Sequence, residues 1–361
     1  MSRPLLAPLG WIVGAAADLR NAAFDQGILR VEDAGVPVIS VGNITAGGSG
    51  KTPLVEHIVR RLAAGGATPG VVSRGYRRQS RGVLVVADGR TVLADARQGG
   101  DEPVQIAHAC PGVRVVVGER RSDAARFAVS QLGADVLVMD DGFQHRYLRR
   151  SLDIVVIDSR NDPFEDRLLP AGMLRERTAC LGRAHMVALS RSETVDVPWS
   201  EKLLRVFQGP LISFVTRGNR LSRFSVGRTA GPADRTGWPW EETIGPVVAF
   251  SGIGDHSVFL AELQRLGIPV AADRRFRDHH WYGAGDAAGL GELLRASSAR
   301  GFVTTEKDAV RLRAEPTVAA AIESAGPLYT LGIAVRVTHG DEELEAALAR
   351  QLRISGSGST A

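Results

Sequence analysis

A glycine-rich segment near the N-terminus constrains the fold of this chain more than any other feature. A short β-branched run, Val36–Val41, leads into a loop that ends in Gly50-Lys51-Thr52, and Pro53 then opens a segment with the apolar spacing of a helix. Glycines let successive backbone N–H groups turn inward around phosphate oxygens, and a helix N-terminus adds partial positive charge. The segment therefore predicts a P-loop, with Lys51 at the β- and γ-phosphates of a nucleotide and the Thr52 hydroxyl offered to Mg²⁺.

One position of this loop departs from the general P-loop pattern, which has glycine six residues before the lysine. This chain has Thr45 at that position. The flanking strand and helix supply the context that the motif requires, so the prediction stands. The residues expected to surround the triphosphate are Thr45, Ala46, Gly47, Gly48, Ser49, Gly50, Lys51 and Thr52.

Strand-like and helix-like segments alternate from Val36 onward. Runs such as Val113–Val117 and Asp153–Ile157 are short and apolar, whereas Pro53–Ala64 has an apolar stripe at helical spacing. Continuous apolar strands are typical of parallel sheets that are covered on both faces. The alternation predicts a P-loop NTPase-like, doubly wound, mostly parallel α/β fold, and a length of 361 residues favours two domains.

A change of composition near Ser190 separates the two predicted units. The stretch 191–242 is rich in Pro, Gly, Arg and Trp, and strand-like sequence resumes at Val247–Phe250. We therefore expect five parts: an amphipathic helix over residues 1–30, a P-loop kinase domain over 31–205, a β-rich linker over 206–245, a smaller α/β domain over 246–353, and a flexible tail over 354–361.

Apolar residues recur at helical spacing in the N-terminal segment. The series is Leu5, Leu9, Ile12, Ala16, Leu19 and Ala23, and such spacing marks one face of a helix. The uncharged run is shorter than the ~20 apolar residues of a membrane-spanning helix, and the periodicity continues past the point where a signal peptide would be cleaved. Two interpretations stay open: the helix packs on the protein, or it lies on a membrane surface.

Arginine supplies most of the positive charge of this chain, whose net charge is +4 and whose pI is about 9.4. Arginine tracts are either solvated surface or sites that bind phosphate or an anionic membrane. No recognised nucleic-acid-binding motif is present, so we expect no nucleic-acid partner. The tracts are Arg74–Arg78, Arg120–Arg121, Arg146–Arg150 and Arg175–Arg177.

Two adjacent carboxylates, Asp140 and Asp141, end the apolar run Val136–Met139. In an open parallel sheet, ligands bind at the carboxyl ends of the strands, and a carboxylate there can hold Mg²⁺ directly or through water. The other interpretation is a solvated strand end that caps a helix. The presence of a P-loop favours the metal site.

Three further segments contain candidate residues. Asp101, in Gly99–Pro103, could act as a general base, but the residues alone favour a helix cap. Asp278-His279 could orient a proton acceptor, although adjacent histidines on a loop are more often surface residues. Leu169–Glu176 could bring Arg175 to a transferring phosphoryl group, but on its own it predicts only a loop that enters a helix.

Together these segments resemble the tetraacyldisaccharide 4′-kinase family, the lipid A 4′-kinases of Gram-negative bacteria. The P-loop with Thr45 and the run Asp140-Asp141-Gly142-Phe143-Gln144-His145 are specific to that family. The N-terminal segment Leu5–Leu29 also resembles the family's membrane-associating segment. Shorter matches follow in order along most of the chain: Val72–Tyr76, Gly100–Pro103, Leu169–Glu176, Asp278–His279 and Thr304–Val310.

The resemblance implies two α/β domains joined by a small β linker, with ATP bound at the cleft. It implies an ATP-dependent transferase that phosphorylates the 4′-hydroxyl of tetraacyldisaccharide 1-phosphate, which forms lipid IVA in lipid A and lipopolysaccharide biosynthesis. We expect Mg²⁺ as the cofactor, and a monomer associated with the cytoplasmic face of the inner membrane as a peripheral or monotopic protein.

The resemblance also implies roles for residues at matching positions. Asp101 resembles the base, aided by His279, and the remaining residues contact phosphate, Mg²⁺ or the acceptor lipid. The full set is catalytic Asp101, His279, Lys51 and Arg175; Mg²⁺-binding Thr52, Asp140, Asp141 and Glu176; and substrate-binding Tyr76, Arg74, Gln144 and Arg121.

Two other functions compete with a lipid kinase. The first is a P-loop GTPase or metallochaperone. Guanine-specific proteins of that kind carry Asn-Lys-x-Asp after a strand, and the nearest match here, Thr305-Glu306-Lys307-Asp308, has a different spacing. No histidine-rich metal tract is present either. The second is a scaffold that binds nucleotide without transferring phosphate, against which the acidic residues at 101, 140 and 141 argue.

Overall fold

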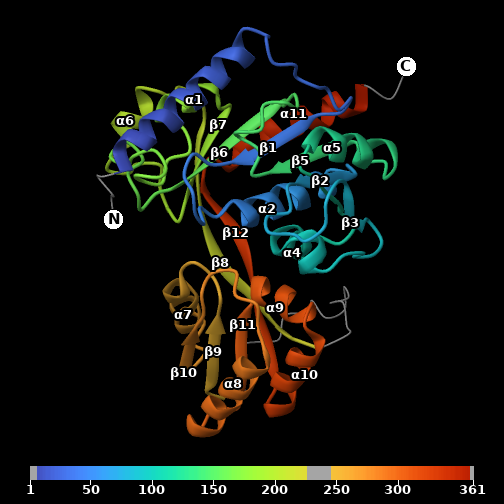
Figure 1. Ribbon diagram of the computed structural model, residues 1–361, viewed down its shortest axis with the longest axis vertical. Coiled ribbons are helices and arrows are strands. Elements are labelled where there is room, and N and C mark those ends of the chain that lie inside the picture. The colour runs from blue at the N-terminus through green and yellow to red at the C-terminus, as the bar shows by residue number, and fades with distance from the viewer. Residues whose placement is uncertain (1–5, 226–244, 358–361) are drawn as a thin grey trace.

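The computed structural model describes residues 6–225 and 245–357, and they form two lobes that share one mixed sheet (Figure 1). Twelve strands of the described residues hydrogen-bond in the order β10-β9-β11-β12-β8-β7-β6-β1-β5-β2-β4-β3. The lower lobe contains one end of this order and the upper lobe the other, while β8 and β12 run through both. The structure therefore confirms the prediction of an α/β fold with a large, mostly parallel sheet.

The upper lobe contains the seven strands from β7 to β3. All of its neighbouring pairs are parallel except β3 with β4. Its central strands are buried along their whole length, as the continuous apolar runs predict. In sheet order the strands are β7 (Met186–Ser190), β6 (Leu152–Asp158), β1 (Val38–Gly42), β5 (Val136–Asp140), β2 (Pro69–Ser73), β4 (Arg114–Val117) and β3 (Leu84–Asp88).

Helices pack on the upper-lobe sheet and shield its core. Three of the long helices contact the sheet, namely α2 (Lys51–Ala64), α4 (Asp101–Ala109) and α5 (Arg121–Ser130), whereas the long helix α1 (Ala7–Asp25) lies on the flank of the lobe. The short ones are α3 (Ala96–Gly99), the 3₁₀ helix η2 (Thr178–Arg183) and α6 (Ser200–Leu204). Helix α2 buries Leu54, Val55, Ile58, Val59 and Leu62, the apolar stripe that the sequence predicts.

The lower lobe surrounds a second, aromatic-rich core. Phe250 makes edge-to-face contacts with Phe276, Tyr282 and Phe302, with ring centroids 5.7–6.4 Å apart, which are favourable aromatic geometries. The strands of this lobe are β10 (Val270–Arg275), β9 (Val247–Ser251) and β11 (Gly301–Thr305), and its helices are α7 (His256–Arg265), α8 (Ala284–Ala296), α9 (Glu306–Arg313) and α10 (Pro316–Ala325).

Two long strands join the lobes. Strand β8 (Leu211–Arg223) pairs with β12 (Leu328–His339) in an antiparallel ribbon, and β8 also continues the upper-lobe sheet through β7. The expected β-rich linker over 206–245 therefore differs from the structure, because β8 is part of one continuous sheet. Residues 226–244 of that expected linker lie outside the described residues.

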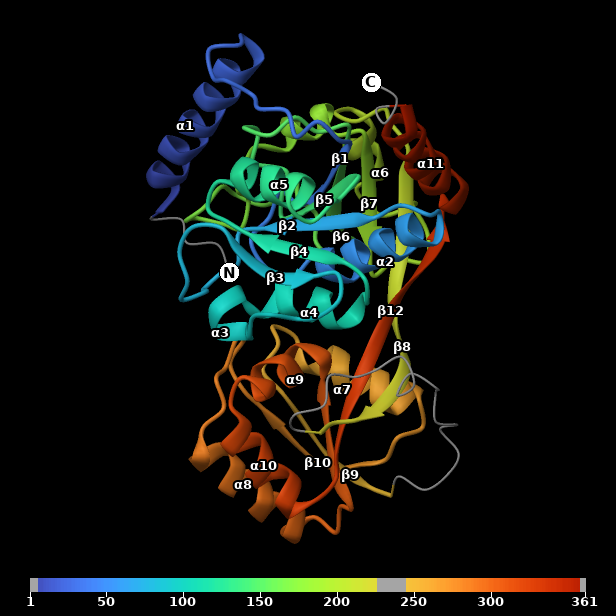
Figure 2. The same ribbon diagram turned by 90° about the vertical axis from the view of Figure 1, so that its right-hand side faces the viewer.

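The last helix returns to the upper lobe. Helix α11 (Asp341–Ser357) follows β12 and lies in the upper lobe in both views (Figures 1 and 2). It buries Leu344 and Leu348 in the same core as α2. The expected 246–353 domain thus differs from the structure in its final segment, since the chain crosses back after β12. The expected flexible tail begins inside this helix, and residues 358–361 lie outside the described residues.

Helix α1 lies on the flank of the upper lobe (Figure 2) and packs through its small residues. Gly10 and Gly14 are buried against Leu168, so closely that an added Cβ would lie 3.0 Å and 2.5 Å from its atoms. The predicted apolar stripe faces the other way, with 66% of Ile12 and 74% of Leu19 exposed. Within the described residues, no helix is both long enough and apolar enough to cross a bilayer.

Candidate active site

The P-loop connects β1 to α2 and is braced by its own buried polar groups. Gly47 and Gly50 adopt φ values of 109° and 84°, a region that favours glycine. Asn43 Nδ2 donates to the Ser49 hydroxyl at 3.1 Å, and both residues are buried. Arg191 Nη2 donates to the Gly48 carbonyl at 3.1 Å. The loop is thus held in place by protein contacts at both ends and at its tip.

The structure explains why threonine is tolerated at position 45. Thr45 is not among the described residues with positive φ, and it forms an antiparallel bridge with Leu174. The next residue, Ala46, donates its N–H to the Met173 carbonyl at 2.7 Å. A strand-like backbone of this kind accepts any side chain, so the glycine of the general motif is not needed here.

The segment Leu169–Glu176 lies against residues 44–46 and places Arg175 beside the P-loop. Its backbone N–H donates to the Ile44 carbonyl at 2.7 Å. Its Nη1 lies 2.9 Å and 2.8 Å from the two carboxylate oxygens of Asp141 and 3.3 Å from the Gln144 side-chain oxygen. Gln144 in turn donates to the Asn43 carbonyl at 2.8 Å. These contacts hold the Arg175 guanidinium next to the P-loop.

Asp141 contacts both cations of this site, Arg175 and Lys51. Its carboxylate is also 3.4 Å from Lys51 Nζ. Burial acts to raise the pKa of Asp141, but the charges of Lys51 and Arg175 outweigh it and hold that pKa below its usual value. Asp141 therefore orients the two cations that are predicted to meet a transferring phosphoryl group.

Asp140 is placed differently from its neighbour. It is buried, it pairs in register with Val41 at the start of the P-loop, and its Oδ1 has no hydrogen-bond partner among the described residues. Burial, together with the charges of Glu102 and Asp141, raises the pKa of Asp140 to about 7. A buried carboxylate oxygen without a partner is costly unless it is neutralised or binds a cation.

These observations fit a Mg²⁺ ion held by few protein ligands. No cluster of three or more His, Cys, Asp or Glu suited to a metal occurs within residues 6–225 and 245–357. Mg²⁺ at nucleotide sites commonly uses one or two protein oxygens and takes its other ligands from phosphates and water. Asp140 and the Thr52 hydroxyl match that limited role.

Glu176 lies in a different set of contacts from the predicted Mg²⁺ site. Its carboxylate accepts a hydrogen bond from Asn21 Nδ2 at 2.8 Å and pairs with Arg183 at 2.9 Å and Arg20 at 3.6 Å. Burial opposes the ionised form, but Arg183 and Asn21 outweigh it and lower the pKa of Glu176. In this arrangement its carboxylate links the Arg175 loop to α1 and does not join Asp140, because three donors already occupy it.

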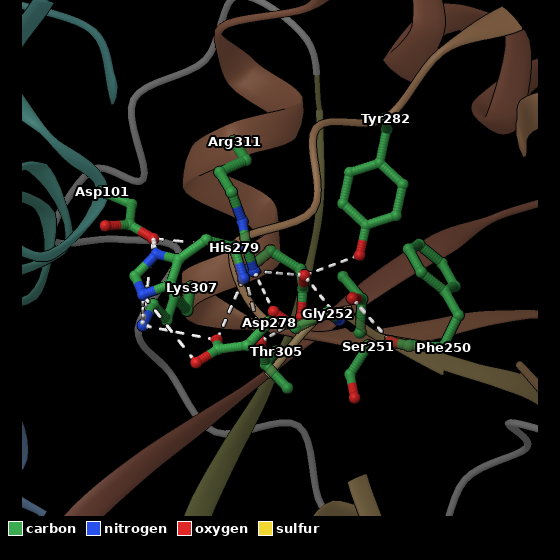
Figure 3. A network of polar contacts seen from close by, with 12 residues as sticks. Asp101, Phe250, Ser251, Gly252, Asp278, His279, Tyr282, Thr305, Lys307 and Arg311 are labelled. Atoms are coloured by element: carbon green, nitrogen blue, oxygen red, sulfur yellow. Dashed lines mark hydrogen bonds and ion pairs between the residues drawn. The ribbon is translucent and has the colours of Figure 1, made fainter. Parts of the chain in front are cut away.

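Asp101 and His279 meet across the boundary between the lobes (Figure 3). Asp101 begins α4 and His279 lies in the loop after β10, 178 positions later, yet Asp101 Oδ2 is 2.7 Å from His279 Nδ1. Burial acts to raise the pKa of Asp101, but the hydrogen bond from His279 and the charges of Lys307 and Arg311 lower it overall. The cap residue of α4 is Gly100, so Asp101 is the first residue of the helix and not the cap that the local sequence favours. Asp101 is instead one half of a polar pair.

The predicted substrate residues lie around this pair and the two aspartates. The Tyr76 ring is exposed and lies 5.8 Å from the His279 ring, in an edge-on arrangement. Burial, followed by the charge of Arg74, lowers the pKa of Arg121 overall, although the charges of Asp141 and Asp140 act to raise it. Arg121 thus experiences the charges of Arg74 and of both aspartates.

Sequence reasoning assigned no role to Lys307, whose ammonium faces the Asp101–His279 pair. Its Nζ lies 3.4 Å from Glu102, 3.5 Å from His279 Nε2 and 3.9 Å from Asp101. The sequence did contain a signal for Lys307, because this residue follows the carboxyl end of strand β11. The same type of position, at the end of β5, predicted a role for Asp140. His280, by contrast, contacts Asp286 at 2.9 Å and stacks on Phe276, which is a structural role.

Comparison with known proteins places these features in a family. The family model described as Tetraacyldisaccharide-1-P 4'-kinase matches residues 2–353. The Tetraacyldisaccharide 4'-kinase of Chlorobium luteolum is 38% identical over 355 residues, which cover 97% of this chain and 98% of that protein. The protein of that name from Anaeromyxobacter dehalogenans strain 2CP-C is 40% identical over 357 residues, which cover 95% of this chain and 92% of that protein.

A solved structure agrees with these relatives. The LpxK protein of Aquifex aeolicus, crystallised in complex with ATP, is 29% identical, superposes with a TM-score of 0.74, and matches over 96% of this chain and 98% of that one. Sequence and structure thus coincide over nearly the full length of the chain. This chain belongs to the tetraacyldisaccharide-1-P 4′-kinase family.

Proposed function

We propose that this chain transfers the γ-phosphoryl group of ATP to the 4′-hydroxyl of tetraacyldisaccharide 1-phosphate, forming lipid IVA. The observation that carries the proposal is the convergence of two elements. One is Asp141, which pairs both with Lys51 of the P-loop and with Arg175 of the adjacent 169–176 loop. The other is the pair of buried Asp101 and half-buried His279 at the lobe boundary. Neither a switch GTPase nor a passive nucleotide-binding scaffold needs an acid–histidine pair facing an acceptor.

In this proposal Asp101 is the general base. It accepts the proton of the 4′-hydroxyl as the 4′-oxygen forms a bond to the γ-phosphorus, and the bond from that phosphorus to the β–γ bridging oxygen breaks to release ADP. Lys51 and Arg175 compensate the charge on the transferring group, the dominant requirement in phosphoryl transfer. His279 donates from Nδ1 to Asp101 and fixes the direction in which that carboxylate faces.

We assign Mg²⁺ to Asp140 and the Thr52 hydroxyl. The orphaned Asp140 Oδ1 is the observation in favour of this assignment. When bound there, the ion would neutralise charge on the β- and γ-phosphates. Tyr76, Arg74, Arg121 and Gln144 are assigned to the acceptor lipid and the phosphate entrance, on the basis of their positions around the two carboxylate groups.

The test is transfer of label from γ-labelled ATP to tetraacyldisaccharide 1-phosphate in detergent micelles. We expect a bisphosphorylated lipid as the product, no labelled product with an acceptor that lacks the free 4′-hydroxyl, and weak competition by GTP. Nucleotide hydrolysis without lipid labelling would overturn the proposal, and tight GTP binding together with that result would favour the GTPase alternative.

We also propose that α1 lies on the cytoplasmic face of the inner membrane, where a lipid acceptor resides. The outward face of the helix presents Leu9, Trp11, Ile12, Val13 and Leu19, which are between 40% and 74% exposed. An apolar helix face of this kind suits the boundary between lipid headgroups and acyl chains. The inward glycine face contacts the loop that carries Arg175, so a docked helix would place the P-loop entrance near the lipid surface.

Changing Leu19 to glutamate is expected to weaken binding to anionic vesicles by about tenfold or more, because burial of a leucine contributes about 1.5–3 kcal/mol. The measurement is vesicle co-sedimentation of the full chain. The matched control is Val258→Glu on α7 of the lower lobe, a residue that is also exposed. Equal binding of both variants and the wild type would argue against α1 as the anchor.

A further inference from the structure

A buried arginine in the lower lobe lies behind the Asp101–His279 pair and has no assigned role. Arg311, on α9, is only 1% exposed and is one of the largest fully buried side chains of the described residues. Its Nη2 donates to Asp308 Oδ1 at 2.6 Å and to the Gly252 carbonyl at 2.8 Å. A buried guanidinium is costly to desolvate, so these contacts need an explanation.

The partner of this arginine is fully engaged. Asp308 Oδ1 accepts hydrogen bonds from the Gly252 N–H at 2.9 Å and the Tyr282 hydroxyl at 2.6 Å, in addition to Arg311. Its other oxygen accepts from the Thr305 hydroxyl at 2.6 Å. A carboxylate with four donors is held rigidly. Arg311 is therefore attached to a fixed point of the lower-lobe core.

The Gly252 carbonyl connects Arg311 directly to His279. That carbonyl accepts both the Arg311 guanidinium and the backbone N–H of His279, the latter at 3.1 Å. His279 has a φ of 60°, a left-handed conformation that a residue other than glycine keeps only when its surroundings hold it there. The Arg311–Gly252 contact thus helps to maintain the backbone that presents the imidazole to Asp101.

The remaining end of the guanidinium points across the lobe boundary. Arg311 Nη1 lies 4.0 Å from Asp101 Oδ2, and neither Nη1 nor Nε has a hydrogen-bond partner among the described residues. A purely structural ion pair gives no reason to leave two buried donors unsatisfied, since nearly all buried donors are paired. Figure 3 shows the Arg311 side chain next to His279 and Gly252, on the side of the lower lobe.

We propose that Arg311 is a positioning residue for the transfer reaction, anchored by Asp308, and that it fixes His279 and directs positive charge onto Asp101 from behind. This inference rests on the proposed function of Asp101. It explains why the Thr305–Arg311 segment, whose Thr305-Glu306-Lys307-Asp308 run fits no guanine-binding motif, carries two cations that face one carboxylate: Lys307 from the outer side and Arg311 from within.

The central test is Arg311→Lys, which keeps the charge but has a single ammonium. Lysine cannot bind Asp308, Gly252 and Asp101 together, because it lacks the planar fork of arginine. We expect kcat on the lipid acceptor to fall by about tenfold while the KM for ATP stays within about twofold, since misplacement of a reacting group acts on the chemical step. The matched control is Arg313→Lys on the same helix, whose guanidinium lies over the Phe224 ring and which should leave kcat unchanged.

A double-mutant cycle with Asp101→Asn separates positioning from mere stabilisation of the fold. If Arg311 acts through Asp101, then Arg311→Lys should cost less than about twofold in kcat when added to Asp101→Asn, because coupled residues are not additive. Tyr282→Phe removes one hydrogen-bond donor to Asp308. We expect it to lower kcat less than Arg311→Lys does, and to have little further effect when Asp101→Asn is present. It replaces Arg311→Lys in the cycle if thermal unfolding shows that the Arg311→Lys protein is not folded.

The outcomes can be told apart. Independent, multiplicative losses in the cycle, or wild-type kcat in Arg311→Lys, would overturn the positioning role while leaving the kinase intact. Absence of lipid phosphorylation by the wild-type protein would instead refute the proposed function on which this inference rests.

Discussion

Replacing Asp101 with asparagine is expected to lower kcat for lipid phosphorylation by about 10²–10⁴-fold, the range that general-base catalysis contributes. Asparagine keeps the size of the side chain and can still meet His279, but it cannot accept the proton of the 4′-hydroxyl. The KM for ATP should stay within about twofold, because Asp101 pairs with His279, Lys307 and Arg311 at the lobe boundary, whereas ATP is predicted to bind the P-loop. Steady-state kinetics with labelled ATP and the micellar acceptor would measure both quantities.

The control for this variant is Glu102→Gln, which alters the neighbouring carboxylate on the same helix turn. Glu102 is about one-third exposed and pairs with Lys307, so we expect a smaller effect. Burial opposes ionisation of Asp101, yet its partners lower its pKa below the ordinary 3.8, and it is therefore ionised throughout the neutral range. A wild-type kcat for Asp101→Asn would remove Asp101 from the base role.

The sequence predicted well those features that depend on neighbouring residues. The P-loop, the apolar stripe of α2 and the central strands each follow from a local pattern, and they appear close to the expected residues. The two carboxylates at the end of β5 were also predictable, because the carboxyl ends of parallel strands form a common edge. Their different environments were not, since burial of Asp140 and the ion pairs of Asp141 come from distant segments.

The features that the sequence could not supply depend on long-range packing. The pairing of β8 with β12 and the return of α11 to the upper lobe join residues more than 100 positions apart. The residues next to Asp101 predicted a helix cap, and they contained no information on its contact with His279. Only the resemblance brought the two residues together, and it said nothing of Arg311 behind them.

Helix α1 shows a related limit. The apolar spacing predicted one buried face, and the small residues Gly10 and Gly14 carried no hydrophobic signal. The structure buries those glycines against Leu168 and exposes Ile12 and Leu19. Close packing of a helix backbone against its neighbour requires small side chains, and a hydrophobicity pattern does not detect a face made of glycines. The pattern therefore did not predict the contact face of α1. The structure thus shows a helix that packs on the protein through its glycine face, and the membrane-surface interpretation stays a proposal for the exposed apolar face.

Replacing Lys51 with methionine is expected to lower kcat/KM for ATP by about 10³-fold or more. Lys51 is predicted to contact the β- and γ-phosphates in both the ground state and the transition state, and loss of a single transition-state donor already costs about 10²–10³-fold. Its removal also leaves Asp141 with Arg175 as its remaining ion-pair partner. The negative charge of Asp141 would then repel the incoming phosphates, so ATP affinity and turnover should fall together.

Two comparisons make this result specific. Lys202→Met removes a lysine that pairs with Asp162 and Glu165, away from the P-loop, and should leave kcat/KM unchanged. The double variant Lys51→Met with Asp141→Asn should recover part of the lost ATP affinity, measured by calorimetry, because it removes the uncompensated carboxylate along with the lysine. If Asp141→Asn gives no recovery, then Asp141 does not act through Lys51, and the carboxylate must act mainly on Arg175 or on the metal ion.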